Sequence, residues 1–141
     1  EKHIPLELFN DIADLNVELI SLQKGDGEEE LDTFKNKIHS FELDTDQLFI
    51  DTIAILQNID LFITVDTALV HLAGLLGIKT FLILGYSSEW RWGKEGSSNY
   101  WYDSVKIFRS NKLGDWSVPL NEIRLLLQQL TFNQENRNQV N

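Results

Sequence analysis

The sequence contains no cysteine and no methionine, and only two of its 141 residues are prolines. Without cysteine the chain has no disulfide, no thiolate metal site and no cysteine nucleophile. Its histidines, His3, His39 and His71, lie far apart without the spacing of metal ligands, so we expect no metal site. Because no initiator methionine is present, we expect the chain to be a piece of a longer protein.

Long apolar runs and basic side chains are also scarce. No run approaches the roughly 20 apolar residues that span a bilayer. The first residues, EKHIPLELF, lack the basic start and apolar centre of a signal peptide. We therefore expect no membrane span and a cytoplasmic location. The net charge of −10 argues against nucleic acid as a partner.

The basic side chains are unevenly distributed along the chain. Residues 1–66 hold 16 acidic and four basic side chains, whereas residues 67–141 hold six acidic and eight basic ones. An anionic ligand would therefore find most of its cationic partners in the second half. A solvated acidic face explains the same split, and the split alone favours that simpler interpretation.

Apolar residues make up 43% of the chain, enough for the core of one domain, which we place at residues 1–132. A polar tail over 133–141 is expected to be disordered. Continuous apolar runs predict buried strands at 61–65 and 79–85, joined by a helix over 67–77. Strand, helix and strand at this spacing form a right-handed parallel crossover.

The remaining segments extend this pattern. Strands are predicted at 17–23, 38–43 and 105–108, and helices at 4–15, 31–38, 47–58 and 119–130. Together they predict an α/β fold, a doubly wound, mostly parallel Rossmann-like sheet with helices on both faces. Ligands of such sheets bind beyond the carboxyl ends of the strands. The candidate site is therefore formed by the loops at 23–27, 42–46, 65–68, 85–92 and 109–116.

The strand-to-helix junction at Asp66-Thr67-Ala68 is one candidate anion site. The free backbone N–H groups and the dipole of a helix start favour a bound anion. Ala68 is small enough to let a phosphate approach the backbone, and Asp66 is most simply a helix N-cap. His71, one turn later, fits either a buried core histidine or a ligand-binding residue.

Two other clusters lie at predicted strand ends. Lys24, after Gln23, could contact a phosphate, although surface lysines after strands are common. Gly25 and Gly27 do not complete a G-x-G-x-x-G dinucleotide motif, which argues against an NAD enzyme. Trp90, Arg91 and Trp92 suit a base, a sugar ring or a phosphate, or they cover the sheet edge. Arg109 is a second candidate anion contact or a partner of Asp115.

Several motifs, in this order, carry a specific resemblance: SLQKG, DTIAILQNIDLFITVDTALVHLAGLLGIKTFLIL, EWRW, WY, IFRS and GDW. They resemble the C-terminal half of bacterial glycosyltransferases similar to family 9, the heptosyltransferases, in a subgroup often linked to tetratricopeptide repeats. The resemblance covers residues 4 to about 130. It implies the donor-binding Rossmann-like domain of a GT-B fold, in which two such domains face a cleft.

The resemblance also implies roles for individual residues. Gln23 and Lys24 would face the donor phosphates, with Asp66, Thr67 and Ala68 forming the phosphate-binding turn and His71 behind it. The 42–46 loop and the helix start at Asp51 and Thr52 would border the nucleoside. Trp90, Arg91, Trp92 and Arg109 would lie near the donor or the cleft. The substrate would be a nucleotide-diphosphate sugar, with no separate cofactor.

The chain departs from the family pattern at Gly77-Ile78-Lys79 and at Gly85-Tyr86, where relatives often have proline. The acceptor site and the catalytic base would lie in an N-terminal domain outside this chain, so the chain alone is expected to be inactive. Two alternatives remain open. One is a non-catalytic module that binds a partner through its aromatic 86–102 segment. The other is half of a GT-B sugar-nucleotide epimerase, with Glu89 as its rim acid.

Overall fold

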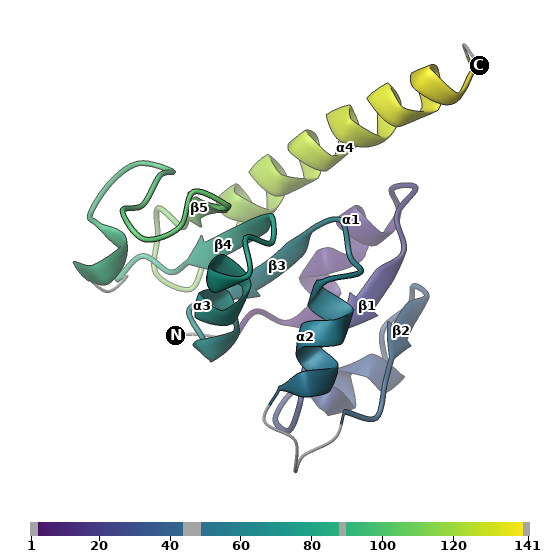
Figure 1. Ribbon diagram of the computed structural model, residues 1–141, viewed down its shortest axis with the longest axis horizontal. Coiled ribbons are helices and arrows are strands. Elements are labelled where there is room, and N and C mark those ends of the chain that lie inside the picture. The colour runs from purple at the N-terminus through teal and green to yellow at the C-terminus, as the bar shows by residue number, and fades with distance from the viewer. Residues whose placement is uncertain (1–2, 44–48, 88–89, 140–141) are drawn as a thin grey trace. The chain divides into compact units, whose positions relative to one another are not determined.

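The computed structural model describes residues 3–43, 49–87 and 90–139 (Figure 1). The chain divides into two compact units, and the predicted single domain over 1–132 stays a prediction. Unit 1 contains Leu43–Pro119, and unit 2 contains Ile4–Glu42 and the chain from Leu120 onward. Each unit has a parallel sheet of its own, three-stranded in unit 1 and two-stranded in unit 2. These parallel sheets among helices confirm the α/β, Rossmann-like class.

The sheet of unit 1 has the order β3-β4-β5, and all of its strands are parallel. Its strands are β3 (Phe62–Val65), β4 (Thr80–Leu84) and β5 (Val105–Arg109). Val65 pairs with Ile83, and Leu84 pairs with Arg109. The carboxyl ends of the three strands therefore lie along one edge of the sheet, as their parallel direction requires.

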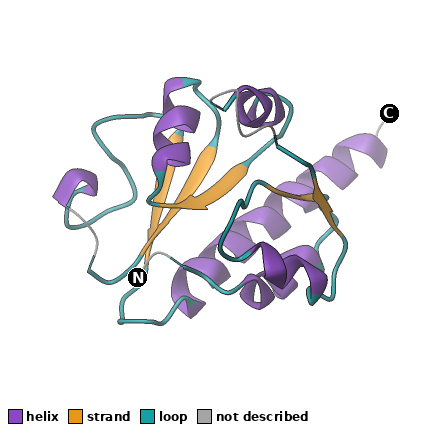
Figure 2. Ribbon diagram, turned by 90° about the horizontal axis from the view of Figure 1, so that it is seen from below, coloured by secondary structure: helices purple, strands orange, loops and turns teal. Residues whose placement is uncertain are grey.

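All five residues of β4 are buried, as its continuous apolar run predicted. The helix α3 (Ala68–Leu75) packs against β3 and β4 (Figure 2). It ends in a Schellman motif, in which the N–H of Ile78 donates to the carbonyl of Ala73 and the N–H of Gly77 to that of Gly74. Gly77 has a φ of +68°, which explains why glycine occupies this position.

The connection from β4 to β5 contains only a short 3-10 helix, η3 (Trp90–Trp92), in its described part. Parallel strands are usually joined by an α-helix that covers the sheet. Here Trp92 and Tyr102 from the connection pack against Val70 of α3, together with side chains of β4 and β5. Large aromatic side chains of the connection thus fill part of the core.

Unit 2 contains a parallel pair of short strands, β1 (Leu19–Ser21) and β2 (Ile38–Ser40). The helix predicted over 4–15 is shorter: a 3-10 helix η1 (Leu6–Phe9) continues into α1 (Asn10–Ala13). The helix predicted over 31–38 is wrong. A 3-10 helix η2 (Glu28–Asp32) covers only its first two residues, and β2 begins at Ile38.

Two more helices differ in length from the prediction. In unit 1, α2 (Ile50–Leu56) lies within the predicted 47–58, of which residues 47 and 48 fall outside the described part. The last helix, α4 (Ser117–Gln139), continues through most of the segment predicted as a disordered tail. No glycine or proline interrupts residues 133–139, and Glu135 accepts a hydrogen bond from Asn16. No helix in the described residues is long and apolar enough for a bilayer.

Candidate functional site

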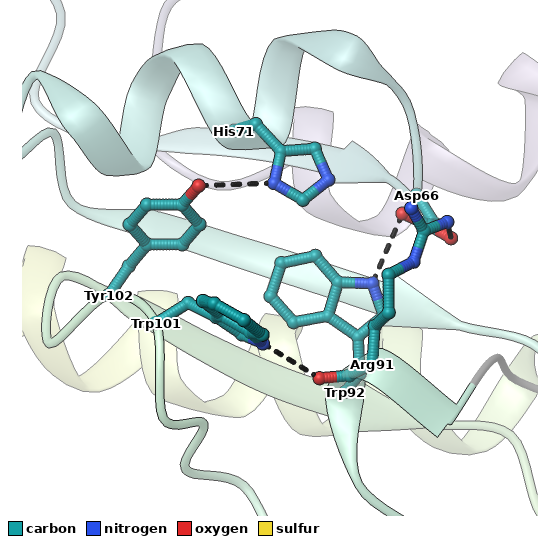
Figure 3. Close-up of polar contacts among 6 residues, drawn as sticks. All are labelled: Asp66, His71, Arg91, Trp92, Trp101 and Tyr102. Carbon is teal, nitrogen blue, oxygen red and sulfur yellow. Dashed lines mark hydrogen bonds and ion pairs between the residues drawn. The ribbon is translucent and has the colours of Figure 1, made fainter.

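Asp66 immediately follows β3 and is the centre of a polar cluster in unit 1 (Figure 3). The indole Nε1–H of Trp92 donates to Asp66 Oδ1 at 3.1 Å, and Arg91 Nη2 lies 3.9 Å from Asp66 Oδ2. The Asp66 side chain is only 11% exposed, whereas that of Arg91 is 42% exposed. The predicted N-cap role of Asp66 is wrong, because the N-cap of α3 is Thr67, whose side chain makes no capping bond.

The backbone at the start of α3 differs in detail from the predicted phosphate turn. The N–H of Thr67 donates to the carbonyl of Val65 at 2.8 Å, so this group is already engaged within the turn. Thr67 and Ala68 are both exposed. The first N–H groups within a helix, here those of Ala68 and Leu69, have no acceptor inside the helix. An anion at this edge would therefore meet the amides of Ala68 and Leu69 rather than that of Thr67.

His71 is half-buried, and its ring contacts two aromatic side chains. Its ring stacks on that of Trp92, with centroids 5.4 Å apart and an angle of 21°. Its Nδ1 lies 3.1 Å from the hydroxyl of Tyr102. The other ring nitrogen, Nε2, faces the side on which Asp66 and Arg91 lie (Figure 3). His71 is thus packed on aromatic rings and still presents a polar atom toward the cluster.

A small pocket of about 200 Å³ opens beside this cluster. Its lining residues are mostly aromatic: His71, Arg91, Trp92, Trp101 and Tyr102. Pockets for drug-sized ligands occupy about 300–1,000 Å³. This pocket is therefore large enough for one ring of a ligand, and the remainder of a nucleotide sugar would lie outside it.

Hydrogen bonds hold the β4–β5 connection against the sheet. Arg109 Nη2 donates to the carbonyl of Trp92 at 2.6 Å, and its Nε donates to that of Gly96 at 3.1 Å. Burial lowers the pKa of Arg109, but a guanidinium keeps its charge at neutral pH. Trp101 Nε1 donates to the carbonyl of Arg91 at 2.9 Å. Arg109 thus supports the backbone of the segment that carries the aromatic cluster.

The other predicted residues lie as follows. Trp90 is 81% exposed in η3, while Asp51 and Thr52 are in the first turn of α2, with Thr52 buried.

Gln23 and Lys24 follow β1 in unit 2, where Gln23 Nε2 donates to the carbonyl of Asp26. Their role toward donor phosphates stays a prediction. Glu89 and most of the 42–46 loop fall outside the described residues.

Sequence reasoning missed two groups of residues that shape the site. Tyr102 and Trp101 line the pocket, and Asn99 holds their backbone through bonds with the N–H groups of both. Gly74 lies where an added Cβ would collide with the ring of Tyr102. A glycine three residues after His71 lies on the same face of the helix, and this spacing could have indicated that another segment packs closely against that face. In residues 3–43, 49–87 and 90–139, no cluster of three or more histidine and acidic side chains is suited to a metal.

Comparison with known proteins finds a family and a relative whose sequences are similar to this chain. The model of glycosyltransferase family 9 (heptosyltransferase) matches residues 7–115. Protein FlbA of Caulobacter vibrioides is 30% identical over 119 residues, covering 79% of this chain and 19% of FlbA. The chain thus spans about a fifth of that relative's length. No solved structure matches significantly. Since the family model covers most of the chain and confirms the resemblance in its motifs, this chain belongs to glycosyltransferase family 9.

Proposed function

We propose that this chain binds the nucleotide-sugar donor of an inverting glycosyltransferase. Membership of family 9 supports a glycosyltransferase-like function. The observation that carries the finer proposal is the position of Arg91. Its exposed guanidinium is 3.9 Å from Asp66, the residue that leads from β3 into the start of α3. A guanidinium and a helix N-terminus at one edge of a sheet suit the phosphates of a nucleoside diphosphate.

The Asp66–Arg91 contact explains how Arg91 could serve a ligand. At 3.9 Å the contact is long for an ion pair, and the Arg91 side chain is 42% exposed, so its guanidinium is accessible to a phosphate. Asp66 keeps the indole N–H of Trp92 as a donor when Arg91 moves, so its carboxylate stays hydrogen-bonded.

The aromatic pocket supplies the second part of the proposed site. Its indole and phenol rings offer faces on which a base or a sugar ring can stack. With the diphosphate at the start of α3, one ring of the donor would occupy the pocket between Trp92 and Trp101. The small volume of the pocket fits a single ring better than a complete nucleoside.

The proposed reaction is a direct displacement at the anomeric carbon of the donor. The oxygen of the acceptor forms a bond to this carbon while the bond from the carbon to the phosphate oxygen breaks. A base outside these 141 residues, in an N-terminal GT-B domain, would take the acceptor proton. This chain would stabilise the negative charge that develops on the leaving diphosphate, through Arg91 and the first amides of α3.

Titration of the ¹⁵N-labelled protein with UDP, ADP and GDP tests the proposal, with affinities measured by calorimetry. We expect at least one of these nucleotides to shift the resonances of residues 66–71 and the indole N–H signals of Trp92 and Trp101. Hydrogen bonds to charged groups contribute about 1.5–3 kcal/mol, so Arg91→Gln should weaken binding by roughly 10- to 150-fold.

Lys94→Gln is the matched control for Arg91→Gln. Lys94 is an exposed cation in the same connection, and its replacement removes the same charge. We expect this variant to bind nucleotide like the original chain. Equal weakening by the two substitutions would mean that only net charge matters, and unchanged spectra with all three nucleotides would contradict the proposal.

A second candidate function is the binding of a partner through the aromatic segment. Tyr86, Trp90, Tyr100 and Trp101 are 64%, 81%, 102% and 60% exposed. Exposed aromatic side chains at this density are typical of interaction sites. This candidate predicts no response to nucleotides, so the same titration distinguishes it from donor binding.

A further inference from the structure

His71 is fixed on two sides by side chains from the β4–β5 connection. The buried indole of Trp92 stacks on its ring, and the hydroxyl of Tyr102 lies 3.1 Å from Nδ1 (Figure 3). The stack limits the tilt of the imidazole, and the hydrogen bond fixes its rotation about the Cβ–Cγ bond. Nε2 therefore keeps one direction, toward the side of Asp66 and Arg91.

Tyr102 is itself held in place from both ends. Its ring lies against the backbone of α3 at Gly74, where even a Cβ would collide with the ring. The side chain of Asn99 brackets its main chain: Oδ1 accepts from the N–H of Tyr102 at 2.8 Å, and Nδ2 donates to its carbonyl at 3.2 Å. The phenol therefore approaches His71 from a position that the fold determines.

The hydrogen-bond chemistry of the pair favours one tautomer of His71. A neutral imidazole has one N–H donor and one acceptor nitrogen, and the hydrogen bond at one nitrogen decides where the proton lies. A phenol hydroxyl is a good donor that rotates freely toward an acceptor. When it donates to Nδ1, the imidazole proton is on Nε2.

We propose that Tyr102 is a positioning residue that holds His71 as the Nε2–H tautomer and directs this N–H toward the ligand oxygens of the site. The choice of tautomer rests on the geometry of the free protein alone. The second part rests on the proposed function, because the oxygens that His71 would meet are those of a nucleoside diphosphate at the start of α3. Tyr102 acts through His71 and need not touch the ligand.

Side-chain ¹⁵N chemical shifts of the histidines test the first part without any ligand. Long-range ¹H–¹⁵N spectra of the neutral form distinguish a protonated ring nitrogen from an unprotonated one. We expect His71 in the unmodified chain to carry its proton on Nε2. In Tyr102→Phe the two nitrogen shifts should move toward each other, since both tautomers become populated. A proton on Nδ1 in the unmodified chain, which needs no variant to detect, would overturn the proposal.

Tyr100→Phe is the matched control, because Tyr100 is fully exposed two residues away and loses the same hydroxyl. We expect the His71 shifts of this variant to equal those of the unmodified chain. Identical shifts in Tyr102→Phe and Tyr100→Phe would show that the phenol of Tyr102 does not select the tautomer. The melting temperature of each variant verifies that the comparison is between folded proteins.

Calorimetry with UDP, ADP and GDP tests the second part. A neutral hydrogen bond contributes about 0.5–1.5 kcal/mol, so Tyr102→Phe should weaken the best-bound nucleotide by roughly 2- to 12-fold, and Tyr100→Phe should not. Unchanged affinity in Tyr102→Phe, while the unmodified chain binds, would overturn the ligand role of His71 and leave the proposed function standing. Tautomer selection by Tyr102 without binding of any nucleotide would support the positioning role and contradict the proposed function.

Discussion

Gly74 determines how closely the β4–β5 connection approaches α3. It lies inside the helix, three residues after His71, where alanine would be the better helix former by about 0.8–1.0 kcal/mol. The ring of Tyr102 occupies the space that a Cβ would take. The atom nearest to that Cβ is Cγ of Tyr102, which cannot move far without its main chain. Glycine at this position thus allows the β4–β5 connection to contact α3, although alanine would stabilise the helix itself more.

Gly74→Ala is expected to destabilise the protein despite the gain in helix propensity. Insertion of a methyl group into a packed site costs about 1–3 kcal/mol. This cost exceeds the gain in helix propensity of about 0.8–1.0 kcal/mol. Urea unfolding monitored by circular dichroism measures the change. In a Tyr102→Ala background the same substitution should be neutral or stabilising. Equal destabilisation in both backgrounds would contradict the assigned contact.

The residue-level predictions were limited by contacts distant in sequence. Asp66 after a strand and before a helix fits the local pattern of an N-cap, and nothing nearby reveals that its carboxylate accepts from Trp92, 26 residues later. Likewise, the apolar residues around His71 do not indicate that its ring contacts the hydroxyl of Tyr102, 31 residues later. The sequence did place Asp66, His71, Arg91 and Trp92 among the candidates, and the structure brings these four side chains together in unit 1 (Figure 3).

Among the elements, β3, α3 and β4 were predicted within about two residues, because their apolar runs and Gly77 are local signals. Helix boundaries were predicted less well in segments that mix polar and apolar residues. The segment 4–15 contains apolar residues at helical spacing but forms two short helices in succession, and residues 133–139 continue α4 because no residue there breaks a helix. Sequence periodicity therefore located the central βαβ unit better than the ends of the chain.

The start of α4 depends on Asp115. Its Oδ1 accepts hydrogen bonds from the hydroxyl of Ser117 at 2.6 Å and from the N–H of Ser117 at 2.9 Å. The hydroxyl bond is the main cause of a lowered pKa of Asp115, followed by the N–H bond and the nearby charge of Lys112, while desolvation opposes them. Because the ionised carboxylate is favoured in the folded state, its contribution to stability is present above the unfolded pKa of about 3.9 and disappears as the pH falls through the folded pKa.

Ser117→Ala should raise the pKa of Asp115 toward its ordinary value, because the strongest of its hydrogen bonds is lost while the N–H bond remains. The variant should also lose less stability on acidification than the unmodified chain does. Carboxyl ¹³C shifts followed as a function of pH measure the pKa. Ser98→Ala, at an exposed serine of the β4–β5 connection, is the control and should leave Asp115 unchanged. An unaltered pKa of Asp115 in Ser117→Ala would contradict this account.

On the scale of the whole molecule, the two compact units belong to one family match. The matched residues 7–115 include most of the first segment of unit 2 and nearly all of unit 1. The chain passes from one unit to the other within α4, whose first residues, Ser117–Pro119, belong to unit 1. The helix α4 therefore contributes residues to both units.

The net charge of −10 leads to a prediction about the molecule as a whole. Binding to nucleic acid depends mainly on cations that neutralise backbone phosphates. We therefore expect no retardation of duplex DNA in a gel-shift assay at about 150 mM salt, a concentration at which nonspecific binders have Kd values of about 10⁻⁴ to 10⁻⁶ M. A basic DNA-binding protein serves as the positive control. A shifted band at micromolar protein would contradict the prediction.

The stack of His71 on Trp92 has an optical consequence. Trp92 is 1% exposed, so its fluorescence emission lies at shorter wavelength than that of Trp90 and Trp101, which are 81% and 60% exposed. The imidazole of His71 stacks on this indole, with ring centroids 5.4 Å apart. A ligand that separates the two rings would therefore change the environment of Trp92 and the light that this residue emits.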